Sequence, residues 1–293
     1  MKLFAISDLH VGFSENAAAL KDMPLCPDDW LILAGDMGET ARHHDEVFAT
    51  LVPRFRQVIW CPGNHELWTT GRNSLAGLAK YESLLALCRR WSVLTPEDDY
   101  AVFSTERERF LIVPMFLLYD YTFRPDGIPP ERAVAWAEES GVLCADEELL
   151  DPRPFATRGD WCRARCHTTE QRIEEARRNT GLRTVLINHF PLKQVFASLP
   201  AIPRFQIWCG TRATEDWHLR FDAAVVVTGH LHIRQTRYMD GTRFEEVSLG
   251  YPRRQWRPER GIAHYLREIL PAEPARAVTG LQPHRFSSGY RPV

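Results

Sequence analysis

Six short apolar runs rich in β-branched residues constrain the fold of this chain more than any other feature of its sequence. They occupy residues 2–7, 30–35, 57–63, 109–116, 183–189 and 223–229. Runs that are this short and this apolar are typical of strands buried on both faces of a sheet. Helical patterns lie between several of them, at residues 40–52, 74–91 and 168–179. This alternation predicts an α/β layered fold.

Three segments depart from the alternation. Residues 117–182 are rich in Pro, Trp, Arg and acids, which predicts an insertion that forms a lid or a small helical cap. Residues 190–217 predict a second long loop, and long loops in compact domains are often functional. From Pro271 onward the sequence is Pro-rich, which predicts a loosely packed tail. We therefore expect a single domain over residues 1–270 and a Pro-rich C-terminal tail over residues 271–293.

Composition and charge exclude several classes of protein. The chain has 36 Lys and Arg against 38 Asp and Glu, a net charge of −2, which gives no support for a nucleic-acid partner or an anionic membrane. No uncharged apolar stretch approaches the roughly 18 residues of a membrane span, and the first apolar run meets Asp8, unlike a signal peptide. The seven cysteines show no repeating spacing, which favours a reducing compartment, the cytoplasm. The sequence leaves the oligomeric state open.

Side chains of the kind that bind metals follow five of the apolar runs at the point where each run ends. The set consists of Asp8, His10, Asp36, Asn64, His189, His230 and His232, with His65 and Glu66 directly after Asn64. In open α/β sheets, ligands bind outside the carboxyl ends of the strands. We therefore expect these side chains to converge, although they span more than 220 positions of the chain.

The chemistry of this set points to a pair of divalent cations. Carboxylates, imidazoles and an amide oxygen suit hard to borderline ions rather than ions bound by soft thiolates. One carboxylate can bridge two cations, and Asp36 is the natural bridge. In a two-metal site the ions clamp both oxygens of an in-line displacement. Gly35, Gly63 and Gly229 stand beside the ligands, where they let the backbone turn sharply and approach closely.

The order of these blocks resembles the calcineurin-like metallophosphoesterase superfamily. The blocks read D-x-H, G-D, G-N-H-E, a strand-end histidine and G-H-x-H, and they extend over residues 8–232. The resemblance implies two packed mixed β-sheets flanked by helices, a four-layer sandwich, into which the helical or loop insertion is built. It also implies two divalent metal ions as cofactors, and Mn, Fe, Zn and Mg are all compatible with the ligands.

The resemblance further implies a role for each residue. One metal is held by Asp8, His10, Asp36 and His232, and the second by Asp36, Asn64, His189 and His230. His65 is the catalytic histidine, and Glu66, which is not normally a ligand in this family, is expected to orient its neighbours. The second block reads G-D-M-G-E, where many members carry a later Asp.

These assignments predict an enzyme, a binuclear metallophosphoesterase in which a hydroxide held between the ions attacks phosphorus. The main interpretation is a phosphomonoesterase whose partner is a small-molecule phosphate ester. The alternative is a phosphodiesterase acting on cyclic nucleotides or other nucleotide-type diesters, since the same metals serve either reaction. A more remote alternative is a non-catalytic scaffold on this fold, which usually loses ligands that this chain retains.

Four residues are expected to contact the substrate. Tyr119 and Arg124 follow the run at 109–116, so they line the pocket or else belong to the core of the insertion. Trp208 lies in the second long loop, where it stacks on substrate or, as Trp more often does, packs in the core. Arg253 opens a basic run that continues with Arg254, Arg257 and Arg260. Such a run is usually a solvated surface, and the functional interpretation is that Arg253 contacts a substrate phosphate.

Overall fold

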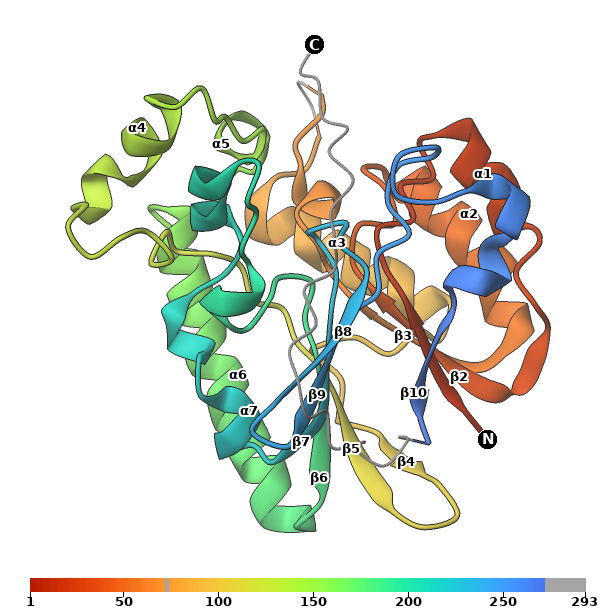
Figure 1. Cartoon of the computed structure of the whole chain (residues 1–293). Helices are drawn as coiled ribbons and strands as arrows, with labels where there is room; N and C mark the ends of the chain where they lie inside the picture. The colour runs from red at the N-terminus through yellow and green to blue at the C-terminus, as the bar shows by residue number, and fades with distance from the viewer. Residues whose placement is uncertain (72–73, 272–293) are drawn as a thin grey trace.

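Two β-sheets stacked face to face occupy the centre of the molecule, with helices on both outer faces (Figure 1). The computed structural model describes residues 1–71 and 74–271. One sheet has four strands in the order β10-β1-β2-β3, and the other has six in the order β4-β5-β6-β7-β9-β8. In the four-stranded sheet, β10 runs antiparallel to β1. In the six-stranded sheet, the edge strands β4 and β8 run antiparallel to their neighbours β5 and β9. The predicted pair of mixed sheets flanked by helices is confirmed.

The elements have the following bounds. The strands are β1 (Leu3–Ile6), β2 (Cys26–Ala34), β3 (Phe55–Cys61), β4 (Val102–Ser104), β5 (Arg109–Pro114), β6 (Arg183–Ile187), β7 (Ala223–Thr228), β8 (Gln235–Met239), β9 (Thr242–Glu246) and β10 (Arg267–Leu270). The α-helices are α1 (Ser14–Leu20), α2 (Ala41–Leu51), α3 (Gly77–Arg90), α4 (Ala133–Glu138), α5 (Asp146–Leu149), α6 (Arg158–Thr180) and α7 (Trp217–Arg220).

Successive residues of the central strands point to two different cores, which explains why the runs are apolar throughout. In β2, Ile32 faces a core between the two sheets, where it joins Val185 and Val225 of the six-stranded sheet. Leu31 and Leu33 point the other way, into a core shared with the outer helices. A strand covered on both faces has no solvent-facing side, so the period of two that marks half-exposed strands is absent.

The three predicted helices form as α2, α3 and α6, and α6 is longer than predicted, whereas α1 and α7 were not predicted. Its N-terminus is capped by the side chain of Thr157, which accepts a hydrogen bond from the backbone N–H of Asp160. Its C-terminus closes at Gly181 in the left-handed conformation, with φ of 64°. The additional turns bury Trp161 and Cys162 in the core. This apolar face of the helix was not recognised in the sequence because the segment is rich in Arg.

The predicted insertion consists of two parts. The helix α6 joins β5 to β6 and covers the outer face of the six-stranded sheet, while α4 and α5 form a separate lobe above it (Figure 1). Residues 190–217 form a succession of single 3₁₀ turns that leads into α7. The predicted tail falls almost entirely on residues 272–293, which lie outside the described residues. Among the residues that are described, no helix has both the length and the apolar character needed to cross a bilayer.

The backbone turns sharply at the strand ends that carry the predicted ligands. Asp8, His10, Asp36, His230 and His232 all have positive φ, between 40° and 72°. Non-glycine residues rarely adopt this conformation, and its cost of about 1–3 kcal/mol each is tolerated mainly at functional sites. Among the three glycines beside the predicted ligands, Gly63 permits the closest approach, because a Cβ atom there would collide with Oδ1 of Asp36.

We predict that Gly63→Ala displaces the Asp36 carboxylate. The added methyl group has no space, so the free energy of unfolding should fall by about 1–3 kcal/mol, the usual cost of overpacking, and the binding of divalent metal should weaken. Thermal unfolding with and without Mn²⁺ measures both effects. Gly127→Ala is the matched control, since a Cβ atom at Gly127 meets nothing within 4 Å. A Gly63→Ala protein with unchanged stability and metal binding would contradict the prediction.

Candidate metal centre

Five predicted ligands converge at the carboxyl ends of strands from both sheets, namely Asp8, His10, Asp36, His189 and His232. His230 belongs to none of the sets described next, but its ring lies edge-on to that of His189 with the centroids 5.2 Å apart. Three overlapping sets have ligand atoms that all lie within 4.8 Å of one another. The sets are Asp8 with His10 and His232, Asp36 with His10 and His65, and Asp8 with Asp36 and His189. Asp8, Asp36 and His10 each belong to two sets, so the three sets form one continuous centre. Its carboxylates lie where β1 and β2 end, next to each other in the four-stranded sheet.

Several buried polar atoms around this centre have no hydrogen-bond partner within the described part of the chain. They include Oδ1 of Asn64 and Nε2 of both His189 and His230. Buried polar atoms are nearly always paired, so each unpaired atom requires an explanation. Nδ1 of His189 donates to the carbonyl oxygen of Ala34 at 2.9 Å, and its Nε2 faces Oδ2 of Asp36 at 3.3 Å. A cation between these atoms would satisfy both, so the donor set fits divalent metal.

The electrostatics of the centre also favour added positive charge. Burial raises the pKa of Asp8, but the neighbouring His232 and His189 outweigh burial and hold that pKa below its ordinary value. Burial lowers the pKa of His10 to about 4 and that of His230 to about 3. Both imidazoles are therefore neutral near pH 7, which is the form that binds metal. Burial also lowers the pKa of His189, but Asp36 and Asp8 outweigh burial and raise that pKa to about 10, so the two buried carboxylates favour positive charge beside them.

Three backbone amides are held in place by Glu66. Its carboxylate accepts hydrogen bonds from the backbone N–H groups of Asp36, Met37 and Gly63, each at 2.9 Å. The side chain is fully buried and makes its contacts with the turns that follow β2 and β3. Glu66 thus orients the backbone that presents Asp36, in agreement with the expectation that it orients its neighbours.

The Asp8 carboxylate is held in a similar way. Its Oδ2 accepts hydrogen bonds from the hydroxyls of Ser7 at 2.6 Å and Ser248 at 2.7 Å. The backbone N–H of His230 donates to the same oxygen at 3.1 Å. Ser248 follows β9 and pairs with Ser7 at the end of β1, so this network joins the two sheets. The other oxygen, Oδ1, lies 2.9 Å from Nε2 of His232.

His65 is oriented by Glu39, which the sequence analysis did not identify as a functional residue. Nδ1 of His65 lies 3.2 Å from Oε1 of Glu39, and its Nε2 lies 3.8 Å from Oδ2 of Asp36. The ring of Trp68 packs against the imidazole with the ring centroids 3.6 Å apart. The signal was present in the block G-D-M-G-E, where Glu39 provides a later acid three residues after Asp36. A carboxylate on Nδ1 fixes the orientation of the ring and points Nε2 toward the centre.

Asp146 is a second residue that sequence reasoning missed. It lies at the start of α5 in the insertion lobe and is fully buried. Its Oδ1 accepts from Nδ2 of Asn64 at 2.9 Å and from Nε1 of Trp68 at 2.6 Å. Because a carboxylate only accepts, the amide nitrogen of Asn64 must face Asp146 and its oxygen must face the metal centre. No pattern in the sequence links two residues 82 positions apart.

The four expected substrate contacts lie away from the centre or on its edge. Trp208 is fully buried and donates from Nε1 to Glu147 at 2.7 Å, so it packs in the core. Tyr119 is also fully buried, one layer behind the site, against Phe190. The Arg124 guanidinium donates to the backbone carbonyls of Ile128 and Tyr121 in its own loop. Arg253 is exposed and forms an ion pair with Glu15.

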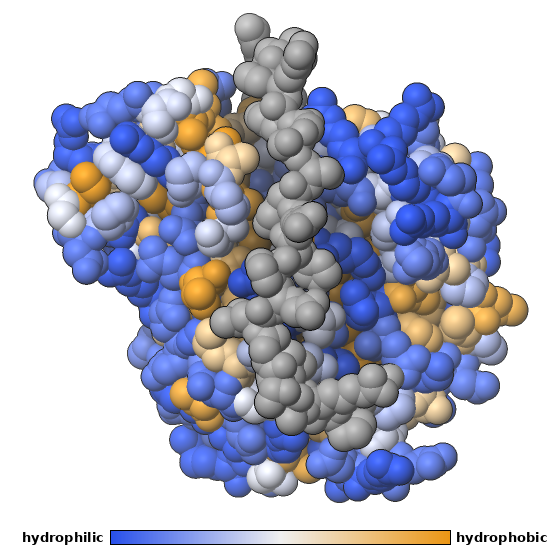
Figure 2. Space-filling view, in the orientation of Figure 1, coloured by the Kyte–Doolittle hydropathy of each residue, from blue (hydrophilic) through white to orange (hydrophobic). Residues whose placement is uncertain are grey.

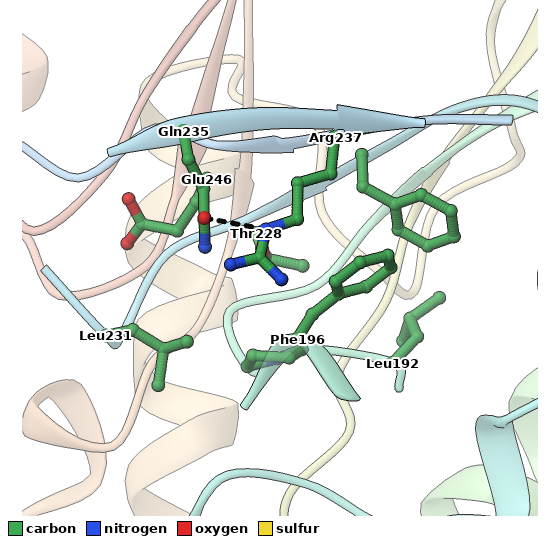
Figure 3. A pocket seen from close by; sticks show the side chains of 9 residues that line it. Leu192, Phe196, Thr228, Leu231, Gln235, Arg237 and Glu246 are labelled. Carbon is green, nitrogen blue, oxygen red and sulfur yellow. Dashed lines mark hydrogen bonds between the residues drawn. The ribbon is translucent and has the colours of Figure 1, made fainter. Parts of the chain in front are cut away.

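Two hollows lie beside the centre. The first is enclosed behind Leu231, where Phe196 faces Arg237 and Gln235 of β8 (Figure 3). Its volume of about 20 Å³ accommodates roughly one water molecule, so it is not a substrate pocket. The second is an open groove of about 890 Å³ that runs between residues 194–215 and β8. The residues that line the groove include no predicted ligand. Two chain neighbours of the lining connect it to the centre: His232 precedes Ile233, and Phe205 precedes Gln206 and stacks on His230 with the ring centroids 6.2 Å apart.

We predict that Asp146→Ala weakens metal binding. Without the carboxylate nothing holds the Asn64 amide, and loss of such a supporting partner typically costs about 10–100-fold in metal affinity. Asp146→Asn retains an acceptor oxygen for both donors and should bind metal nearly as well as the wild type. Calorimetric titration of metal-free protein with Mn²⁺ measures the affinities, and circular dichroism checks the fold.

The control for this experiment is Asp151→Ala. Asp151 belongs to the same lobe, and its side chain bonds to Arg153 rather than to a predicted ligand. We expect unchanged metal affinity in that variant. If folded Asp146→Ala bound Mn²⁺ as tightly as the wild type, Asp146 would have no part in the metal centre.

Comparison with known proteins places this fold and site in a family. The family model described as calcineurin-like phosphoesterase matches residues 1–234. The acyl-carrier-protein phosphodiesterase PptH of Mycobacterium tuberculosis is 45% identical over 273 residues, which cover 92% of this chain and 83% of that protein. The crystal structure of phosphopantetheinyl hydrolase (PptH) from the same organism matches with a TM-score of 0.84 and 44% identity, covering 92% of this chain and 96% of that one.

The similarity to PptH corrects the expected substrate. The sequence analysis predicted a free small-molecule phosphate ester as partner, and a phosphomonoester before a diester. The relative is named for a phosphodiesterase activity on an acyl carrier protein, which is a protein-attached substrate. The small-molecule partner is therefore wrong, and the phosphodiesterase alternative is the better supported one. The metal ligands could not reveal this, because the same two-metal chemistry serves monoesters and diesters.

The matched region runs from the first strand to just beyond His232, the last predicted ligand, and so covers every block that the sequence analysis used. The chain thus belongs to the calcineurin-like phosphoesterase family and is a hydrolase of phosphoric esters, in a family that uses divalent metal ions.

Proposed function

We propose that this protein hydrolyses the phosphodiester that joins a phosphopantetheinyl group to an acyl carrier protein. The observation that carries the proposal is the 45% identity to PptH over 92% of the chain, together with its TM-score of 0.84. Water adds to phosphorus, the bond from phosphorus to the carrier-protein oxygen breaks, and that oxygen leaves with a proton. The products are the unmodified carrier protein and phosphopantetheine.

The residues of the centre divide between two cations in this proposal. Asp8, His10, Asp36 and His232 hold one cation, and Asp36, Asn64, His189 and His230 hold the other. When bound, divalent ions of this kind lower the pKa of water and stabilise negative charge on phosphoryl oxygens. The chain's own contribution is to fix these ligands, through Glu66 on the Asp36 turn, the serines on Asp8 and Asp146 on Asn64. The identity of the metals is open among Mn, Fe, Zn and Mg.

His65 supplies the proton or hydrogen bond to the leaving oxygen. Glu39 holds Nδ1, so Nε2 faces the side of the centre where Asp36 lies. The imidazole is mostly buried, with 13% of its side chain exposed, so it is shielded from solvent yet open to a substrate. General acid catalysis of this kind contributes about 10²–10⁴-fold to rate.

The open groove supports a substrate with a long arm. Its volume of about 890 Å³ is far more than a phosphate group needs and falls within the range of pockets for extended ligands. Three glutamines on its walls make the lining polar, and their side chains are held by internal hydrogen bonds: Gln194 to Phe123, Gln206 to Gln194 and Gln235 to Arg237.

The cysteines bear on the location of the protein. All seven are free, and proteins with free cysteines are typical of a reducing compartment, which supports a cytoplasmic location.

The direct test incubates Mn²⁺-loaded protein with a phosphopantetheinylated acyl carrier protein. We expect intact-protein mass spectrometry to show loss of one phosphopantetheinyl group, and expect p-nitrophenyl phosphate to be a much poorer substrate than bis-p-nitrophenyl phosphate. Asp36→Asn, which alters the proposed bridging ligand, should be inactive on all three. A carrier protein left intact by enzyme that hydrolyses the small diester would refute the substrate but not the reaction class.

The role of His65 predicts a separation of metal binding from turnover. His65→Asn should retain both metals and lose about 10²–10⁴-fold in kcat, because only the group that serves the leaving oxygen is removed. Metal content by mass spectrometry and kcat on the small diester give the two readouts. His167→Asn, on the exposed side of α6, is the control and should behave as wild type. Loss of one metal equivalent from His65→Asn would show that His65 is a ligand instead.

A further inference from the structure

We propose that residues 251–261, here called the basic turn, form a docking surface for an acidic face of the carrier protein. The proposal rests on the proposed function and adds the surface on which the protein part of the substrate is bound. The basic turn contains Arg253, Arg254, Arg257 and Arg260, the basic run for which the metal chemistry has no use.

The basic turn starts directly at the metal centre. The ring of Tyr251 stacks on His10 with the ring centroids 5.0 Å apart and meets His232 edge-on at 4.7 Å. One residue earlier, the backbone N–H of Gly250 donates to the carbonyl oxygen of Asp8 at 3.0 Å. A protein bound on the basic turn therefore lies beside the site where its phosphodiester must react.

Buried contacts hold the basic turn in one conformation. Trp256 is fully buried, and its Nε1 donates to Oδ1 of Asn16 at 2.9 Å. The backbone N–H of Arg253 donates to the carbonyl of Trp256 at 3.0 Å, and that of Arg257 donates to the hydroxyl of Tyr265 at 2.8 Å. A surface that is already ordered loses little conformational entropy when a partner binds.

The arginines of the basic turn project into solvent with little internal compensation. All four are exposed, and within residues 1–71 and 74–271 their only ion pair joins Arg253 to Glu15 at 3.4 Å. Glu259 is the single acid within the turn. Other exposed arginines are mixed: Arg212 pairs with Asp126 and Arg132 with Glu139, whereas Arg56 and Arg89 form no ion pair within the same described residues. The corner of the molecule beside α1, where this segment runs, is strongly hydrophilic (Figures 1 and 2).

An acidic protein face fits this surface better than a nucleic acid does. Guanidinium groups bind carboxylates in a bidentate manner, and four of them on one short turn match a small cluster of Asp and Glu. A nucleic acid requires a longer basic track, and the chain as a whole has a net charge of −2. Charges at the rim of an interface mainly raise the association rate and make it depend on salt.

The test reverses two charges of the basic turn with the double substitution Arg254→Glu and Arg257→Glu. Neither residue touches a predicted metal ligand. We expect at least a ten-fold loss in kcat/KM on phosphopantetheinylated carrier protein, carried by KM, with the salt dependence of the wild type largely abolished. Hydrolysis of bis-p-nitrophenyl phosphate and the metal content should be unchanged. The matched control is Arg107→Glu with Arg109→Glu, an equal charge change on exposed residues of the β4–β5 hairpin at the far end of the sheet (Figure 1).

Each outcome decides the matter. If the wild type hydrolyses the carrier protein and the double variant does so with the same KM and salt dependence, the docking surface is refuted and the proposed function stands. Equal losses in the control variant refute it too, because the effect is then one of net charge. If the double variant also loses activity on the small diester, the basic turn acts on the metal centre and not in docking. If the wild type leaves the carrier protein intact, the proposed function fails, and inhibition by a short oligonucleotide that the double variant escapes would assign the turn to nucleic acid.

Discussion

Two carboxylates, Asp8 and Asp36, lie fully or almost fully buried within a few ångströms of each other. The other residues of the centre are arranged around the negative charge of these two groups. Placing such charges in a protein interior is costly unless positive charge compensates them. His232 and His189 approach the two carboxylates at 2.9 Å and 3.3 Å. The unpaired ring and amide atoms around them complete a donor set that divalent cations satisfy.

The surrounding structure serves mainly to hold these ligands still. Glu66 fixes the turn that carries Asp36, and Ser7 and Ser248 fix Asp8 across the junction of the two sheets. Asp146 brings the insertion lobe into the same network through Asn64. The lobe is thus coupled to the centre by a buried hydrogen bond, so a change in the lobe can alter metal binding without contact with the metals. Loss of a supporting residue of this kind typically costs about 10–100-fold in metal affinity or activity.

Reactivity and specificity are separate properties of this protein. In the proposed function the predicted metal ligands account for the hydrolysis of a phosphoric ester, and the same ligands serve substrates that differ in what is attached to the phosphorus. The choice of substrate belongs to surfaces outside them, and the groove along β8 and the basic turn are two such surfaces. This division explains why the reaction class followed from the sequence while the small-molecule partner did not.

The sequence by itself determined the six central strands and the family and predicted the ligand set, because these depend on local patterns. A fully apolar run followed by Asp or His can be recognised in the sequence without knowledge of the tertiary structure. The strands β1, β2 and β6 end just before Asp8, Asp36 and His189, as the sequence predicted. Only the tertiary structure decided how Glu39 meets His65, how Asp146 meets Asn64 and that Trp208 packs in the core. Those contacts join segments up to 82 residues apart. In such long-range contacts the role of a side chain depends on which helix, strand or loop packs against it. The spacing of residues along the chain does not contain that information.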